Sequence, residues 1–186
     1  MSTHTAPRPT PATTRLGVAR PPGLVLGGAT LLMGLLAGFF FAYSVSVMPG
    51  LGRADDRTLV DAMQQINEAV ENPVFLLVFL GAPALALAAA IRERHAGAPA
   101  RWIAAAAVLC GLALLITFAI SIPLNDDLAQ AGDPARIADM AAVREDYEDP
   151  WVAWNIVRTL ASTAALGCLV HALLLRARGS ALTAGR

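Results

Sequence analysis

The chain has few cysteines and histidines. Its two cysteines, Cys110 and Cys168, both lie inside long apolar runs, so no CxxC pattern occurs and a disulfide is not expected. The three histidines, His4, His95 and His171, are far apart in the sequence and belong to no carboxylate and histidine cluster. Phosphate-binding glycine loops and a Ser-His-Asp arrangement are also missing. We therefore expect no metal site and no cofactor.

Charge is scarce as well, and lysine is absent, since all fourteen basic residues are arginines. Charged residues make up 15% of the chain and hydrophobic residues 56%, and the mean hydropathy is +0.56. The charged fraction is lower and the hydrophobic fraction is higher than in ordinary globular domains, so much of the apolar surface should face lipid. The sequence therefore predicts an integral membrane protein, and its 186 residues suit one compact unit.

Four long stretches are almost free of charge and long enough to cross a bilayer as helices. Their predicted bounds are 24–47, 74–91, 102–124 and 151–175. We predict an all-α fold, a four-transmembrane-helix bundle that occupies residues 23–176. Residues 1–22 hold five prolines and show no apolar periodicity, which predicts a disordered tail, and residues 177–186 are predicted to form a short second tail.

The connections between spans one and two and between spans three and four are acidic, and each is predicted to hold a short amphipathic helix. Residues 55–71 place one apolar stripe on a helix, and residues 134–147 can form a second, shorter helix. The stripe consists of Leu59, Met63, Ile66 and Val70. Gln64, Asn67 and Asn72 border the first stripe, so their amides point either to water or into a pocket beneath the helix.

Arginines and carboxylates are segregated along the chain. The two termini and the connection between spans two and three together hold nine arginines and one acid, whereas the two long connections hold four arginines and thirteen acids. By the positive-inside rule both termini are cytoplasmic and the acidic loops face outward, as in a multi-pass protein of the bacterial cytoplasmic (inner) membrane. Such a surface would repel nucleic acid. The expected partner is the lipid bilayer, and the sequence allows a homo-oligomer without specifying one.

The start of the fourth span gathers more polar chemistry than any other stretch. Read as a helix, Trp151, Trp154, Asn155 and Arg158 stand at i, i+3, i+4 and i+7 and share one face. Arg158 lies about one or two turns inside the membrane. A charge there costs from about 2.5 kcal/mol upward, so we expect the guanidinium to face protein and to have a partner.

The third span ends in a polar stripe that could supply this partner. Thr117, Ser121 and Asn125 follow one another at a spacing of four and line one side of a helix. Because a polar stripe facing lipid would be costly, it should face the bundle, and Asn125 is our first candidate for a neighbour of Arg158. Tyr43, near the outer end of the first span, could border the same space.

Two interpretations of Arg158 remain open from the residues. In the first, it fastens the outer loops through a buried ion pair with one of four acids, namely Asp126, Asp127, Glu145 or Glu148. In the second, it binds an anion or phenolate in a shallow cavity that opens outward and has Asn125 and Asn155 as hydrogen-bonding walls. Trp151 and Trp154 are then either membrane-interface anchors or platforms for a substrate.

Six short segments, in this order along the chain, resemble the anthrone-oxygenase-like family of integral membrane proteins. Together they extend over about two thirds of the chain. They are residues 38–44 (GFFFAYS), 47–51 (VMPGL), 63–67 (MQQIN), 72–75 (NPVF), 123–125 (PLN) and 151–159 (WVAWNIVRT).

The resemblance implies a four-helix membrane bundle and, for fungal members, the oxidation of an anthrone to an anthraquinone by oxygen without metal or flavin. A protein then needs to bind flat rings, stabilise an enolate oxygen and exclude water. Transferred to this chain, Arg158 with Asn155 and Asn125 would hold the enolate, and Trp151 and Trp154 would stack on the rings.

The remaining assignments are less direct. Asp126 or Asp127 could act as the base by position. Substrate-binding candidates are Gln64, Asn67, Asn72, Tyr43 and Ser121 beside the two indoles. Bacterial relatives often have Asn where Ser121 stands and His where Ile156 stands, so a base at position 156 would be missing here. The alternative function is a non-enzymatic membrane module that binds a partner protein, lipid or small ligand through its acidic outer loops.

Overall fold

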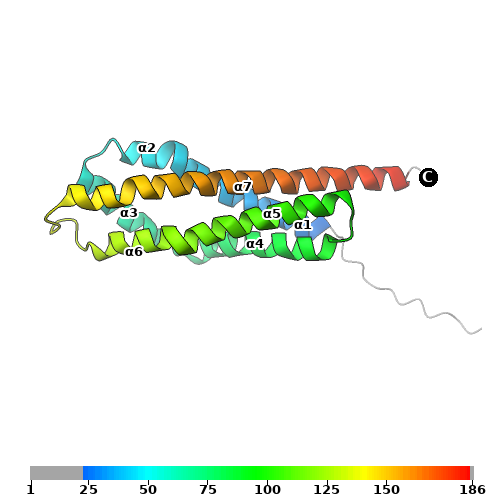
Figure 1. Cartoon of the computed structure of the whole chain (residues 1–186), viewed down its shortest axis with the longest axis horizontal. Helices are drawn as coiled ribbons and strands as arrows, with labels where there is room; N and C mark the ends of the chain where they lie inside the picture. The colour runs from blue at the N-terminus through cyan, green and yellow to red at the C-terminus, as the bar shows by residue number, and fades with distance from the viewer. Residues whose placement is uncertain (1–22, 185–186) are drawn as a thin grey trace, which may run out of the picture.

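The computed structural model describes the backbone of residues 23–184 and the side chains of residues 23–179, and this part of the chain is helical throughout apart from short connections (Figure 1). Four segments are long and apolar enough to cross a membrane: Gly23–Leu51, Pro73–Glu93, Ala98–Gln130 and Met140–Gly179. They pack side by side as a bundle, which confirms the predicted fold class. The predicted disordered tail, residues 1–22, lies outside the described residues.

Two of the four long segments are interrupted by π-helical turns. The first consists of α1 (Gly23–Ala42), η1 (Tyr43–Val47) and α2 (Met48–Leu51), and the third of α5 (Ala98–Ile116), η2 (Thr117–Ser121) and α6 (Ile122–Gln130). The second is α4 (Pro73–Glu93), which continues through Pro83, and the fourth is α7 (Met140–Ala184). A separate amphipathic helix, α3 (Asp56–Val70), lies at one end of the bundle (Figure 1).

Each long helix packs against two others, in the cyclic order α1, α4, α5, α7. Small side chains such as Ala82, Ala86 and Ala106 are fully buried along these contacts, because small residues allow helices to approach closely in a membrane. A second cluster of buried residues joins α2, α3, α6 and the start of α7 at one end of the bundle. This cluster fixes α3 over the open end of the four helices.

The prediction of an amphipathic helix over residues 55–71 is confirmed by α3. Asp55 caps its start by accepting hydrogen bonds from the Thr58 amide and hydroxyl, and these bonds lower the pKa of the Asp55 carboxyl. Leu59 and Met63 of the predicted stripe are fully buried. Helix α4 follows after a short turn, capped by Asn72, with Pro73 at its first position.

The second acidic connection is much shorter than its sequence indicated. We expected a loop over residues 125–150 with a separate helix over residues 134–147. Instead the third segment stays helical to Gln130 and α7 begins at Met140 and runs through Pro150, so only residues 131–139 form the connection. Pro150 cannot donate to the carbonyl of Asp146, and because Asp146 is exposed, water can solvate that carbonyl. Helix α7 also continues through residues 177–184, which we had predicted as part of a tail.

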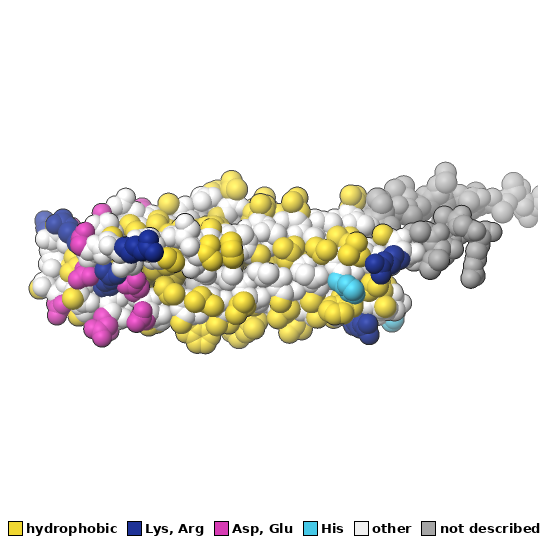
Figure 2. Space-filling model, turned by 90° about the horizontal axis from the view of Figure 1, so that it is seen from above, with side chains coloured by type: hydrophobic (Ala, Val, Ile, Leu, Met, Phe, Trp, Pro, Cys, Tyr) yellow, Lys and Arg dark blue, Asp and Glu magenta, His cyan; other side chains and the backbone are white. Residues whose placement is uncertain are grey.

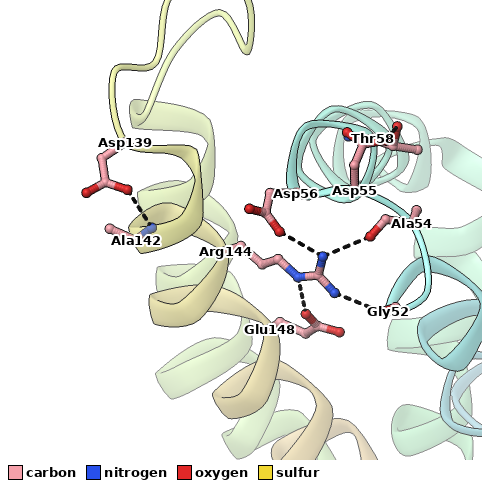
Figure 3. Close-up of polar contacts among 9 residues, drawn as sticks. All are labelled: Gly52, Ala54, Asp55, Asp56, Thr58, Asp139, Ala142, Arg144 and Glu148. Carbon is pink, nitrogen blue, oxygen red and sulfur yellow. Dashed lines mark hydrogen bonds and ion pairs between the residues drawn. The ribbon is translucent and has the colours of Figure 1, made fainter.

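Arg144 fastens the first acidic connection to α7 (Figure 3). Its guanidinium donates to the Asp56 carboxylate at 2.9 Å, to the Glu148 carboxylate at 2.6 Å and to the carbonyls of Ala54 and Gly52 at 3.0 and 2.9 Å. Gly52 is required for close approach, since a Cβ there would lie 2.9 Å from the Glu148 Oε1 atom. We call these five residues the Arg144 cluster. It holds α3 against the bundle end.

The surface divides along the long axis (Figure 2). On the face shown, acidic side chains gather at the end formed by α2, α3, α6 and the first turns of α7, which we call the acidic end, while hydrophobic and uncharged atoms cover the long middle part. Many of the exposed large hydrophobic side chains belong to the four candidate spans. The distribution fits a bundle surrounded by lipid. Which end faces the cytoplasm stays a prediction.

Candidate functional site

A cavity of about 900 Å³ lies inside the bundle near the acidic end. Its walls come from α1 and η1, α4, η2 with α6, and α7, and the inner side of α3 covers it. This volume lies within the range of small-molecule binding sites. Because α3 and all four long segments contribute residues, the cavity depends on how these five parts of the chain are packed.

Both π-helical turns border this cavity. Tyr43 of η1 and Thr117 and Ser121 of η2 line it, and the latter two are almost fully buried. A π-helical turn shifts the i to i−4 hydrogen-bond ladder and occurs frequently at functional sites. Here the Phe40 carbonyl, just before η1, accepts side-chain hydrogen bonds from Asn155 at 3.0 Å and Ser44 at 3.2 Å.

Arg158 is the buried cation of the cavity wall, with 5% of its surface exposed. Its Nη2 donates to Asn155 Oδ1 at 3.0 Å and its Nη1 to Thr117 Oγ1 at 3.4 Å, while its Nε is buried without a partner. The guanidinium carbon lies 4.6 Å from the Phe40 ring centre and 5.4 Å from that of Trp151. The rings offer the charge partial compensation of about 2 kcal/mol each when desolvated.

Among residues 23–179 no carboxylate lies within ion-pair distance of Arg158. The interpretation in which Arg158 fastens the loops through an acid is therefore wrong, and Arg144 performs that role, with Glu148 and Asp56 as its acids. Burying a guanidinium with only neutral partners is costly, and a nearby anion would lower that cost.

Asn125 is not the hydrogen-bonding neighbour of Arg158 that we expected. Its Oδ1 accepts from the Trp151 indole at 3.0 Å and from the Tyr147 hydroxyl at 3.1 Å, and Asn67 donates to the same hydroxyl at 3.3 Å. Since the third segment and α7 are antiparallel, the contact between Asn125 and Trp151 fixes their register. Arg158 lies seven residues, roughly 10 Å, beyond Trp151 along α7, and Thr117 lies about as far before Asn125 along the third segment. The side chains of Arg158 and Thr117 therefore meet.

Asn155 uses its whole side-chain amide within the protein. Its Nδ2 donates to the Phe40 carbonyl and, at 2.9 Å, to Ser44 Oγ, and its Oδ1 accepts from Arg158. Thr159 adds a bond from its hydroxyl to the Asn155 carbonyl at 2.8 Å and a contact to Ser44 Oγ at 3.0 Å. The arrangement ties α7 to the end of α1 and orients the Arg158 guanidinium.

Eight of the ten site residues named from the sequence line the cavity. They are Tyr43, Gln64, Asn67, Ser121, Asn125, Trp151, Asn155 and Arg158. Trp154 and Asn72 do not. Trp154 stands at the edge of the helical face and is 38% exposed, because its position is rotated by about 60° from Trp151. Asn72 instead caps α4, where its Oδ1 accepts from the amides of Val74 and Phe75.

The cavity wall has a polar rim and an aromatic interior. Four carboxylates, those of Glu68, Glu71, Asp126 and Asp133, lie at the rim, whereas Asp127 does not line the cavity. Gln64 closes part of the rim by donating to the carbonyls of Leu128 and Gly132 at 2.8 and 3.0 Å. The described residues contain no group of three or more metal-binding side chains.

The aromatic interior is the part of the site that sequence reasoning missed. It consists of Phe39, Phe40, Phe75, Phe79 and Phe118. Phe75 and Phe79 stack with ring centres 5.6 Å apart, and Phe39 contacts both Tyr43 and Phe75. For Phe75 and Phe79 the available signal was their i, i+4 spacing within α4. Ile156 is 44% exposed and does not line the cavity, so a side chain at that position would not face it.

One comparison with known proteins gave a match. A family model described as anthrone oxygenase matches residues 65–168, which is more than half of the chain. The match extends from α3 into α7 and contains Asn125, Asn155 and Arg158. No curated protein and no solved structure matches the chain significantly. The family match confirms the resemblance, although the segments 38–44 and 47–51 lie outside the matched residues.

Proposed function

The chain belongs to the anthrone oxygenase family, and from that premise we propose that it oxidises a flat aromatic substrate, an anthrone or a close analogue, in the cavity near the acidic end. The overall reaction converts one anthrone and one O2 into one anthraquinone and one water. The observation that carries the proposal is Arg158, a buried cation with no carboxylate partner that lines a cavity with aromatic walls.

The proposed chemistry needs few groups from the protein. A base removes one methylene proton, and the electron pair left behind delocalises onto the carbonyl oxygen as an enolate. The anion gives one electron to O2, and the resulting radical and superoxide combine through a new C–O bond to a hydroperoxide after protonation. Loss of the second methylene proton together with hydroxide, as the O–O bond breaks, leaves the second carbonyl and releases water. The electrons come from the substrate, and O2 is the oxidant.

Each role has a candidate residue. Arg158 stabilises the enolate oxygen with its positive charge at the cavity wall, and Asn155 is a positioning residue that orients the guanidinium. The phenylalanines and Trp151 contact the rings; Trp154, outside the cavity, has no part in this. Asp126, at the rim, is the proposed base in preference to Asp127, which does not line the cavity. Tyr147 and Asn125 hold Trp151 in place.

Oxygen uptake by the purified protein with anthrone tests the proposal. Wild type should consume O2 above the uncatalysed rate, and with ¹⁸O2 the quinone should gain one labelled oxygen atom. Arg158→Ala should lose about 10²- to 10³-fold in kcat, as when an oxyanion donor is removed. Arg158→Lys, which keeps the charge, should retain part of the activity, and exposed Arg136→Ala should retain all of it.

Two results would count against the proposal. Wild type that does not exceed the uncatalysed rate with any anthrone rejects oxygenase activity. Arg158→Ala that is folded and as active as wild type rejects the role of the guanidinium. Size-exclusion chromatography and circular dichroism of each variant separate these results from a loss of folding.

A further inference from the structure

The cavity has a second, apolar edge that lies on the lipid-facing side of the bundle. Four lining residues, Leu76, Leu80, Phe118 and Ile122, are 44, 49, 56 and 38% exposed, so each side chain faces both the cavity and the outside. All four belong to candidate membrane spans, two from α4 and two from η2 and α6. We call these four residues the seam.

The packing of the helices explains why the seam is open. Helix α4 packs closely against α1 and α5, whereas η2 and α6 pack against α7, and α6 also against α3. The second and third segments therefore stay in contact in the halves that lie away from the acidic end, and they separate towards the acidic end. A ring contact between Phe79 and Phe118, with centres 6.0 Å apart, bridges the two walls beside the cavity.

The inside of the cavity and its rim carry charges of opposite sign. Inside, Arg158 has no anionic partner, so the site favours an anion. At the rim, the carboxylates of Glu68, Glu71 and Asp126 have no basic partner within ion-pair distance among the described residues, and only Asp133 pairs, with Arg136 at 3.6 Å. A dissolved anion that approaches through this rim meets like charge before it can reach the guanidinium.

We propose that the ligand is a neutral, lipid-dissolved phenol or enol that enters sideways through the seam and becomes an anion only beside Arg158. The inference rests on the proposed function for the aromatic nature of the ligand and for the base. A neutral ligand with apolar rings partitions into the bilayer, and the exposed leucines and Phe118 offer it an apolar entrance. In the cavity the ligand gives its hydroxyl proton to the carboxylate of Asp126, the proposed base. The acidic rim then excludes water-soluble anions of similar shape.

The rate of ligand binding tests the route without any need for turnover. Protein in proteoliposomes, with Trp102→Phe and Trp154→Phe so that Trp151 is the remaining indole, is mixed rapidly with 2-hydroxyanthraquinone, and the quenching of fluorescence is followed. The double variant L76F/L80F narrows the seam. The matched control L77F/L87F places the same two changes on exposed α4 positions that do not line the cavity.

We expect L76F/L80F to slow quenching by tenfold or more and L77F/L87F to stay within twofold of the parent protein. Anthraquinone-2-sulfonate, a permanent anion that stays in water, should quench at least tenfold more slowly than 2-hydroxyanthraquinone. Equal rates in L76F/L80F and its parent, or quenching by the sulfonate as fast as by the phenol, would overturn the proposal and make the rim the entrance.

If L76F/L80F does not fold, a second variant tests the entry route of the ligand. In E68Q/E71Q the rate with 2-hydroxyanthraquinone should stay within twofold, because the neutral ligand does not cross the rim, and a larger change would reject entry through the seam. The outcome is independent of oxygenase activity: seam-dependent binding without oxygen uptake rejects the proposed function alone, and uptake with seam-independent binding rejects the entry route alone.

Discussion

Arg158 is a buried guanidinium that only neutral groups compensate, whereas Arg144, at the acidic end, is held by two carboxylates. This difference distinguishes a candidate ligand-binding residue, Arg158, from a residue with a structural role, Arg144. The Arg144 cluster uses its charges within the protein, while Arg158 lines the cavity without a carboxylate partner among the described residues, and its Nε is buried without a hydrogen bond. Asn155 is the residue on which the orientation of Arg158 depends most, since its amide joins the guanidinium to the Phe40 carbonyl and Ser44.

Asn155→Ala should weaken both the fold and the site. The Phe40 carbonyl and the Arg158 guanidinium each lose a buried partner, so the free energy of unfolding should fall by about 1–3 kcal/mol. If the proposed function holds, kcat should fall by about tenfold or more while Arg158 remains present. Thermal unfolding and oxygen uptake measure the two effects. Ile156→Ala, next to it but outside the cavity, is the control, and equal behaviour of the two variants would contradict the positioning role.

The inward position of Arg158 could be predicted from its cost in lipid, and the inward stripe of Thr117, Ser121 and Asn125 from its spacing. The partner of Arg158 could not, because it depends on the register between two antiparallel helices. A contact between Trp151 and Asn125 sets that register, and the sequence of either helix alone does not contain it. Trp154 was predicted to belong to the site because helical periodicity alone does not show where one face of a helix ends.

Helix α3 covers the cavity, and the Arg144 cluster fixes α3 to the start of α7. The two π-helical turns at the cavity left no signal in the sequence, since their residues fit an α-helix equally well. The pattern of α3 itself was clear, because one side of it is apolar and Asp55 caps its start. The prediction of a separate helix over residues 134–147 was wrong, because α7 begins at Met140 and continues through Pro150 into the fourth span.

Arg144→Gln should loosen α3 without unfolding the four spans. The substitution removes the hydrogen bonds to two carboxylates and two carbonyls, and bonds to charged groups contribute about 1.5–3 kcal/mol each at most. Amide exchange within residues 56–70 should speed up by about tenfold or more, while α4 and α5 stay as protected as before. Arg136→Gln, an exposed arginine, should change neither. Unchanged exchange in α3 would show that the buried apolar cluster alone holds it.

For the whole molecule, the number of spans and the bundle were predictable, because four long apolar stretches leave a membrane protein few other arrangements. The cavity was not, since it is the space left where the second and third segments separate. The segregation of charge predicts that the acidic end faces outward, and the structure leaves this prediction to experiment.

Single cysteines test the orientation. In a protein with Cys110→Ala and Cys168→Ala, Ala135→Cys lies in the connection at the acidic end and Ala96→Cys in the connection between α4 and α5. A membrane-impermeant maleimide added to intact cells should label position 135 and not position 96, because arginine-rich connections stay in the cytoplasm. Both should react after the cells are opened. Labelling of position 96 alone in intact cells would reverse the topology.

The most direct test of Arg158 as an anion site is the pKa of a phenol bound in the cavity. The visible absorbance of 2-hydroxyanthraquinone reports its ionisation, so a pH titration of the ligand bound to detergent-purified protein gives its pKa. A nearby buried cation stabilises the phenolate, so the pKa should be lower by about one unit or more in wild type than in folded Arg158→Ala, with Arg158→Lys between them. The same pKa in all three proteins would contradict anion binding by Arg158, and the proposed oxygenase mechanism would lose its main support.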